Sequence, residues 1–334
     1  RTTVVREPVI AKQPVSPKLS LTILVVIGGG LASGIGLVFI VDTLDDRARS
    51  PEELQVELNL PTLATIGILD EEEEFEDGVG LETTHMWNTS DDAAAESFRT
   101  IRTVLVMGTE DSDRIAVTSA EPSDGKTTIS CNLAIAYQQA GKRVLIIDAD
   151  MRKPGLTKVI DRRGQVGLSD ILRGTEEVPE QASSLATQTG SVPVDIIPAG
   201  RRPPNPGELL LGDRFAELLA WADGEYDQVI VDAPPVLAGT DAAAVGRLCD
   251  GLMLVVRPEK NRRRVLIKAV ETLRMFGVTL FGTVVNAVGL EEMGYGYGYG
   301  YGYGYGYGYG DEYGLDDDDE YGDDEEEETY MRAA

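Results

Sequence analysis

Short apolar runs alternate with helical patterns along the chain between residues 93 and 290. Apolar, mostly β-branched runs predict strands near 115–119, 143–148, 193–197, 228–232, 251–256 and 279–286. Apolar residues at helical spacing predict helices near 93–106, 126–140, 206–221, 241–248 and 261–275. Alternation of this kind specifies a parallel sheet covered by helices on both faces. We therefore expect an α/β domain over residues 93–290.

A candidate phosphate-binding loop joins the first strand of this domain to the helix that follows. Residues 120–128 read Ala-Glu-Pro-Ser-Asp-Gly-Lys-Thr-Thr, with an alanine where the usual pattern has its first glycine. A strand, loop and helix in this order aim backbone N–H groups and the helix N-terminus at phosphates. Lys126 would reach the β- and γ-phosphate oxygens, and Thr127 would offer its hydroxyl to Mg²⁺. The predicted nucleotide-binding residues of the loop are Ser123, Asp124, Gly125, Lys126, Thr127 and Thr128.

Three aspartates end two of the other predicted strands. Asp148 and Asp150 follow Val144–Ile147, and Asp232 follows Gln228–Val231. Because ligands of a parallel sheet lie beyond the carboxyl ends of its strands, all three should surround the loop. Each aspartate could instead cap a helix, but three beside Gly125-Lys126-Thr127 favour a Mg²⁺ ion between carboxylates and triphosphate. Mg²⁺ keeps several waters, so most of these carboxylates should act through water or on the nucleophile.

Residues 20–41 are uncharged and consist mainly of Leu, Ile, Val and Gly. This stretch is long enough to cross a bilayer and too long for a core strand. Pro-rich sequence precedes it and no small-residue cleavage pattern follows it, which argues against a signal peptide. We predict one transmembrane helix, with residues 1–19 as an extracytoplasmic stub and 42–92 as a juxtamembrane linker.

The charges beside this helix conflict with the orientation that a nucleotide site requires. Positive-inside counting places the N-terminal side in the cytoplasm, because four basic residues precede the helix and two follow it closely. ATP chemistry instead requires residues 93–290 to be cytoplasmic, and we give the nucleotide site more weight. The chain starts at Arg1 rather than Met, so we expect one more helix upstream that sets the topology.

The net charge of −27 is concentrated in two acidic runs, residues 70–77 and 311–328. Such a chain has no electrostatic basis for binding nucleic acid, which requires a clustered basic surface. Two cysteines argue against a disulfide scaffold and fit a reducing compartment. Residues 291–334 form a tail of Tyr, Gly and acid that we expect to be disordered.

The tail holds eleven of the thirteen tyrosines, and eight of them alternate with glycine. Glycine at every second position weakens a strand, so a flexible phosphate acceptor is the better interpretation, with a low-complexity spacer as the alternative. The candidate phosphoacceptors are Tyr295, Tyr297, Tyr299, Tyr301, Tyr303, Tyr305, Tyr307, Tyr309, Tyr313, Tyr321 and Tyr330.

Several of these motifs together resemble the bacterial tyrosine autokinases that partner or form part of polysaccharide co-polymerases, which regulate chain length in capsule and exopolysaccharide export. The motifs that carry the resemblance are Glu96-x-x-Arg99-x-x-Arg102, Asp148-x-Asp150-x-Arg152-x-Pro154, Asp232-x-Pro234-Pro235 and Gly282-x-Val284-x-Asn286. It implies a P-loop ATPase-like sheet and an ATP- and Mg²⁺-dependent kinase at the cell membrane. Its implied partners are its own copies in a ring-like oligomer, the polysaccharide export machinery and a tyrosine phosphatase.

The resemblance also implies roles for single residues. Asp148 would be the candidate base, with Lys126 on the phosphates, although the division of roles among the three aspartates stays open. Thr127, Asp150 and Asp232 would surround the metal, and Asn286 would approach the adenine. Glu96, Arg99 and Arg102 would mediate self-association, with an ion pair within the helix as the alternative. Two other functions stay open: a partitioning-type ATPase switch, whose usual additional lysine is missing from residues 121–124, and a polysaccharide chain-length scaffold.

Overall fold

The computed structural model describes residues 19–44, 46–47, 51–69, 85–88, 92–109, 112–189 and 192–289. The N-terminal stub and the tyrosine-rich tail lie outside the described residues. Within the described part, eight strands form one sheet in the order β1-β8-β7-β2-β6-β3-β5-β4. The strands are β1 (Thr62–Gly67), β2 (Arg114–Ser119), β3 (Val144–Asp148), β4 (Thr187–Thr189), β5 (Val192–Ile197), β6 (Gln228–Asp232), β7 (Gly251–Val256) and β8 (Leu280–Val288).

Seven of these strands run parallel, and only β4 at one edge is antiparallel to its neighbour β5. The predicted parallel sheet is confirmed. Each central strand is apolar on both sides because helices cover both faces. In β3, Leu145 and Ile147 join the core on one face, while Val144 and Ile146 join the core on the other.

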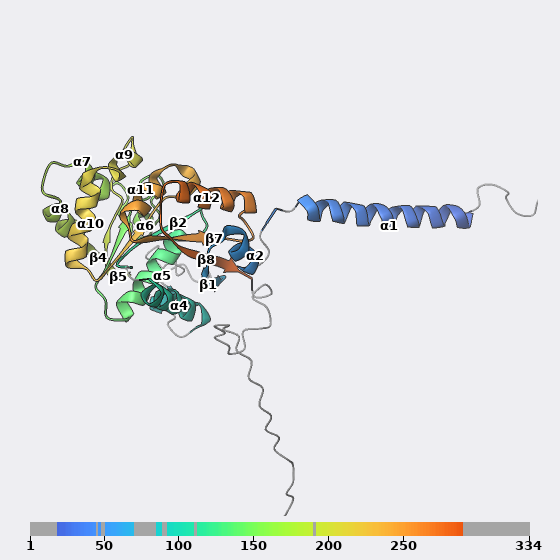
Figure 1. Ribbon diagram of the computed structural model, residues 1–334, viewed down its shortest axis with the longest axis horizontal. Helices are drawn as coiled ribbons and strands as arrows, with labels where there is room; N and C mark the ends of the chain where they lie inside the picture. The colour runs from blue at the N-terminus through green and yellow to red at the C-terminus, as the bar shows by residue number, and fades with distance from the viewer. Residues whose placement is uncertain are drawn as a thin grey trace, which may run out of the picture. The chain divides into compact units, whose positions relative to one another are not determined.

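Helices occupy both faces of the sheet (Figure 1). One face is covered by α3 (His85–Asn88), α4 (Ala93–Gly108) and α5 (Lys126–Gln139). The other face is covered by α2 (Pro51–Leu58), α7 (Leu168–Arg173), α8 (Val178–Leu185), α9 (Pro206–Leu210), α10 (Asp213–Glu225), α11 (Asp241–Leu248) and α12 (Arg263–Met275). The short helix α6 (Gly155–Val159) and a 3-10 turn, η2 (Val236–Ala238), follow β3 and β6 and adjoin the site described below.

The segment expected to be a linker, residues 42–92, contributes α2, β1 and α3 to the folded domain. β1 pairs in parallel with β8, and Leu54 and Leu58 of α2 are buried in the core. Arg274 of α12 donates to the main-chain oxygens of Leu58 and Asn59 at the end of α2. The sheet therefore begins upstream of residue 93, at the strand that follows α2.

The helix α1 (Leu19–Leu44) agrees with the predicted transmembrane segment. Residues Leu21–Ile40 are apolar and long enough to cross a membrane, and their side chains are not buried against the rest of the chain. A soluble core helix of this composition would be buried, so its exposure is consistent with a membrane anchor.

Candidate nucleotide site

The loop between β2 and α5 is bent into the shape that the phosphate-loop prediction requires. Ser123 and Gly125 both have positive φ angles, of 65° and 97°. A Cβ atom on Gly125 would collide with the side-chain amide of Asn286 on β8. Position 125 therefore needs glycine both for its backbone conformation and for the close approach of β8.

Lys126, at the start of α5, lies between two of the predicted aspartates. Its Nζ atom is 3.0 Å from Asp150 Oδ2 and 3.4 Å from Asp232 Oδ1. Only 7% of the residue is exposed. Burial favours the neutral amine, but the charges of Asp232 and Asp150 outweigh this effect and raise the pKa of Lys126 above its ordinary value. The side chain is therefore held as an ammonium ion beside the loop.

The carboxylate of Asp232 contacts the side chains of both Lys126 and Thr127. Its Oδ2 atom accepts a 2.6 Å hydrogen bond from Thr127 Oγ, and its Oδ1 faces Lys126. Burial raises the pKa of this carboxyl group, while Lys126 and Thr127 act in the opposite direction. Thr127 and Lys126 thus contact the same carboxylate that was predicted to lie beside the metal.

Asp148 has a different environment from the other two aspartates. Its Oδ2 atom accepts hydrogen bonds from the main-chain N and the hydroxyl of Thr157, at 2.8 and 2.7 Å. Its Oδ1 accepts a 3.2 Å bond from Asp150 N. Complete burial, followed by the charge of Asp232, raises the pKa of Asp148 to about 7. Asp148 and Asp232 are paired residues of adjacent strands, which explains this repulsion.

The remaining predicted loop residues also lie here. Ser123 is exposed, Asp124 is fully buried, and Thr128 accepts a hydrogen bond from Asn132 through its main-chain oxygen. Asn286 donates to the main-chain oxygen of Asp124 at 2.9 Å. The structure brings Asn286 against the phosphate loop, and its expected approach to adenine stays a prediction.

The donor set fits a Mg²⁺–nucleotide complex rather than a metal held by protein alone. Among the described residues, no group of three or more His, Cys, Asp or Glu side chains could bind a metal ion. Mg²⁺ in nucleotide sites uses one or two protein oxygens and completes its shell with phosphate oxygens and water. Thr127, Asp150 and Asp232 supply oxygens of the required kind, and Lys126 lies between the two carboxylates.

An ion pair beside the site was not predicted. Arg152 contacts Asp241, at the start of α11, through two hydrogen bonds of 2.6 and 3.1 Å. The main-chain N of Arg152 also lies 3.2 Å from Asp150 Oδ1. The pair therefore joins the loop after β3 to the segment after β6. Arg152 belongs to the quoted Asp148 motif, but no sequence spacing identifies its partner 89 residues away.

The residues predicted to mediate self-association, Glu96, Arg99 and Arg102, all lie on α4. Arg99 makes a 3.1 Å ion pair with Glu96 within the helix. Arg102 donates a 2.6 Å hydrogen bond to the main-chain oxygen of Ala136 on α5. The intrahelical ion pair considered as an alternative is thus present, and self-association through these residues stays a prediction.

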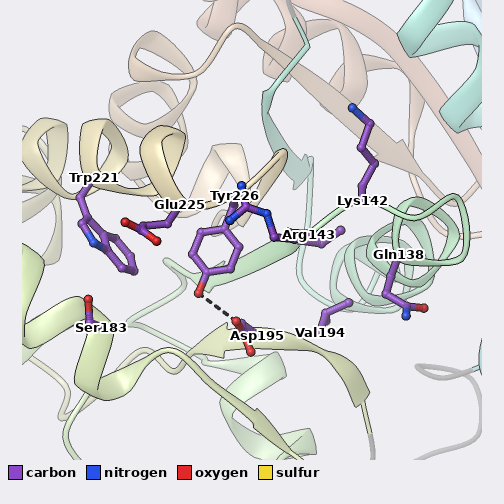
Figure 2. Close-up of a pocket in the computed structure, with 10 residues that line it drawn as sticks. Gln138, Lys142, Arg143, Ser183, Val194, Asp195, Trp221, Glu225 and Tyr226 are labelled. Atoms are coloured by element: carbon purple, nitrogen blue, oxygen red, sulfur yellow. Dashed lines mark hydrogen bonds between the residues drawn. The ribbon is translucent and has the colours of Figure 1, made fainter.

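A pocket of about 480 Å³ lies at the opposite ends of the strands and contains none of the predicted site residues. Arg143, directly before β3, and Tyr226, two residues before β6, both line it. Figure 2 shows the Tyr226 hydroxyl directed at Asp195, to which it donates a 2.9 Å hydrogen bond. The ring of Trp221 packs edge-on against Tyr226, with centroids 5.9 Å apart. This pocket is separate from the nucleotide site.

The fold and loop define a nucleotide-binding domain with a phosphate loop. Residues 115–294 match the family described as the CobQ/CobB/MinD/ParA nucleotide binding domain. The chain is 39% identical over 206 residues to tyrosine-protein kinase wzc of Salmonella typhimurium, covering 61% of this chain and 28% of that protein. It is 33% identical over 292 residues to tyrosine-protein kinase etk of Escherichia coli, covering 83% and 39%.

Solved kinase domains are similar along their whole length. The kinase domain of Escherichia coli tyrosine kinase ETK is 30% identical, with a TM-score of 0.65 over 78% of this chain and 100% of that one. The BceF tyrosine kinase domain is 31% identical, with a TM-score of 0.62 over 72% and 99%. The chain belongs to the bacterial tyrosine kinases within this nucleotide-binding family. It spans between about a quarter and two fifths of the curated relatives that it matches.

Proposed function

We propose that this chain is a membrane-anchored protein-tyrosine autokinase that transfers the γ-phosphoryl group of ATP to tyrosines of its own or a neighbour's C-terminal tail. The observation that carries the proposal is Lys126, held between Asp150 and Asp232 beside Thr127, in a domain that matches whole tyrosine kinase domains. The tail beyond this domain supplies the acceptors in the same chain.

The two tyrosines outside the tail are poor acceptors. Tyr137 is 1% exposed and its hydroxyl is buried in the core between α5 and the sheet. Tyr226 is partly buried with its hydroxyl on Asp195, and burial raises its pKa. Neither hydroxyl can reach a nucleotide without unfolding its surroundings. The acceptors are therefore the tail tyrosines, from Tyr295 to Tyr330.

Phosphoryl transfer depends mainly on positioning and on neutralising charge. Lys126 starts helix α5, so its ammonium group and the helix N-terminus act on the same phosphates. Thr127, whose hydroxyl lies beside Asp232, would be a ligand of the nucleotide-bound metal. Bound Mg²⁺ supplies further charge neutralisation across the phosphate oxygens.

The contacts of Asp148, Asp150 and Asp232 suggest a different role for Asp148 than for the other two aspartates. Asp150 faces Lys126, and Asp232 faces both Lys126 and Thr127, so these two carboxylates would hold the metal or its waters when the nucleotide complex is bound. Asp148 keeps its hydrogen bonds to Thr157. One lone pair of Asp148 Oδ1 remains for the acceptor hydroxyl, directly or through water, and a carboxylate whose pKa is raised suits a general base.

The proposal extends to the location and the partners of the chain. In this proposal α1 anchors the chain in the cell membrane, because it is apolar and long enough to cross it, and the kinase domain lies in the cytoplasm, where ATP is available. One relative, 33% identical over 299 residues, is named as a putative tyrosine-protein kinase in the cps region of Klebsiella pneumoniae. The partners are its own copies, through Glu96, Arg99 and Arg102, the polysaccharide export machinery and a tyrosine phosphatase.

The test is intact-mass measurement of the purified full chain after incubation with ATP and Mg²⁺. The wild type should gain several phosphoryl groups, and peptide mapping should place them between residues 295 and 330. Lys126→Met should gain none while keeping its fold, because it loses the charge that stabilises the transferring group. Asp148→Asn should lower kcat more than ATP affinity, because a lost base affects the transition state.

A chain with all eleven tail tyrosines replaced by Phe is the matched control. It should bind ATP normally and gain almost no mass. If the wild type binds ATP and changes its oligomeric state without gaining mass, the chain is a partitioning-type switch instead. A wild type that neither binds ATP nor gains mass would indicate a scaffold.

A further inference from the structure

Asp124 is a buried carboxylate at the centre of the phosphate loop, and its solvent exposure is 0%. Its Oδ2 atom accepts a 2.9 Å hydrogen bond from the main-chain N of Glu121. Its Oδ1 atom accepts from Lys260 Nζ at 2.6 Å and from Asn261 Nδ2 at 3.1 Å. Its main-chain oxygen accepts from Asn286. Both carboxylate oxygens of Asp124 therefore accept hydrogen bonds from protein donors that hold the loop.

The backbone on both sides of Asp124 needs external support. Ser123 and Gly125 are both in the left-handed region, and Ser123 is not glycine. A non-glycine residue in that region is strained and persists only where its surroundings hold it. The buried contacts of Asp124, between these two residues, provide such support.

Two of the supporting residues come from the loop between β7 and α12. Asn261 is fully buried, accepts a hydrogen bond from Arg257 N, and donates to Glu121 Oε2 as well as to Asp124. Lys260 also donates to the main-chain oxygen of Pro122. Both residues therefore bind the phosphate loop at two points, from a position more than 130 residues later in the chain.

We propose that Lys260 and Asn261 are positioning residues, which act through Asp124 to hold the phosphate loop in the shape that receives the nucleotide phosphates. The inference rests on the proposed function only in taking ATP as the nucleotide. It does not require tyrosine to be the acceptor. Lys260 thus stabilises the loop by neutralising the buried carboxylate of Asp124, while Lys126 acts on the phosphates.

The experiment measures the Kd of a fluorescent ATP analogue, with Mg²⁺, for the purified full chain in detergent micelles. The variants are Lys260→Met, Lys260→Arg, Asn261→Ala, Asp124→Asn and the double variant Lys260→Met with Asp124→Asn. The control is Lys268→Met, an exposed lysine of α12. Urea unfolding without nucleotide gives the stability of each variant.

Removing Lys260 leaves the buried carboxylate of Asp124 without its cation. The loop must then rearrange before it can bind the phosphates of ATP, which weakens ATP binding. We expect Lys260→Met and Asn261→Ala to raise Kd between about tenfold and a hundredfold, and Lys260→Arg to stay within about threefold of wild type. KM for ATP should rise in parallel, with little change in kcat, because the loop is equally organised in ground and transition states. Lys268→Met should bind like wild type.

The double variant separates support through Asp124 from direct phosphate contact. If Lys260 acts through Asp124, Lys260→Met should add almost nothing to the effect of Asp124→Asn. Additive effects would mean that Lys260 contacts the nucleotide itself and would overturn the proposal. Unchanged or tighter binding by Lys260→Met, or weaker binding explained by a larger unfolded fraction, would also overturn it. A wild type that binds no ATP would instead refute the proposed function.

Discussion

The ion pair between Arg152 and Asp241 gives a quantitative test of how the loops around the site are held. Asp241 is 2% exposed, and its carboxylate accepts two hydrogen bonds from one guanidinium group. Breaking a fully buried pair costs about 3–5 kcal/mol because the remaining charge is uncompensated. The Arg152 side chain keeps 37% of its exposure, so water reaches the pair and lowers this cost. We expect Arg152→Ala to reduce the free energy of unfolding by about 2 kcal/mol.

Urea unfolding of the full chain in micelles, followed by tryptophan fluorescence, measures this loss. With an m-value of about 2 kcal/mol/M, the midpoint should fall by about 1 M. Arg143→Ala is the matched control, because Arg143 is 62% exposed in its ion pair with Asp227, and its midpoint should not change. Adding Asp241→Asn to Arg152→Ala should recover part of the loss by removing the buried charge. Equal midpoints for Arg152→Ala and Arg143→Ala would refute the reasoning.

Two further predictions concern other contacts of the domain. Arg263→Glu should detach α2 from α12, because Arg263 bonds Glu53 at 2.6 Å and Glu57 at 2.8 Å and a carboxylate would repel both. Faster hydrogen exchange over residues 51–58 would show this, and unchanged protection would contradict it. The second prediction is that Gly125→Ala lowers ATP affinity at least about a hundredfold. The Cβ atom of the alanine would collide with Asn286, and the φ angle at this position is positive. Calorimetric titration with ATP and Mg²⁺ measures it, and wild-type affinity would disprove the clash.

The sheet was predictable wherever a strand is covered on both faces. All five residues of β3 and all five of β6 are buried, which requires a continuous apolar run of recognisable length. The same strands end in aspartates, and parallel neighbours end at the same edge. The approach of Asp150 and Asp232 to the phosphate loop was therefore predictable from the shared edge of parallel strands, whereas their ion pairs with Lys126 come from the structure.

Other elements lack such a pattern. β1 has only two buried residues, Leu63 and Ile66, and is held to β8 through main-chain hydrogen bonds that any sequence can make. The single helix predicted over 206–221 is two helices, α9 and α10, because the chain turns at Leu211 and Gly212. Lys260 and Asn261 could not be predicted as loop contacts, since nothing in their sequence spacing relates them to Asp124.

The alanine at position 120 shows which parts of the phosphate-loop pattern the backbone requires. Ala120 is fully buried, packs in the core on the α11 and α12 face, and does not have a positive φ. A methyl group is therefore accommodated there, and even gains apolar contact. Gly125 is different, because both its φ angle and the neighbouring Asn286 exclude a side chain. The departure from the usual pattern thus falls where a glycine is dispensable, and the glycine that the loop geometry requires is present.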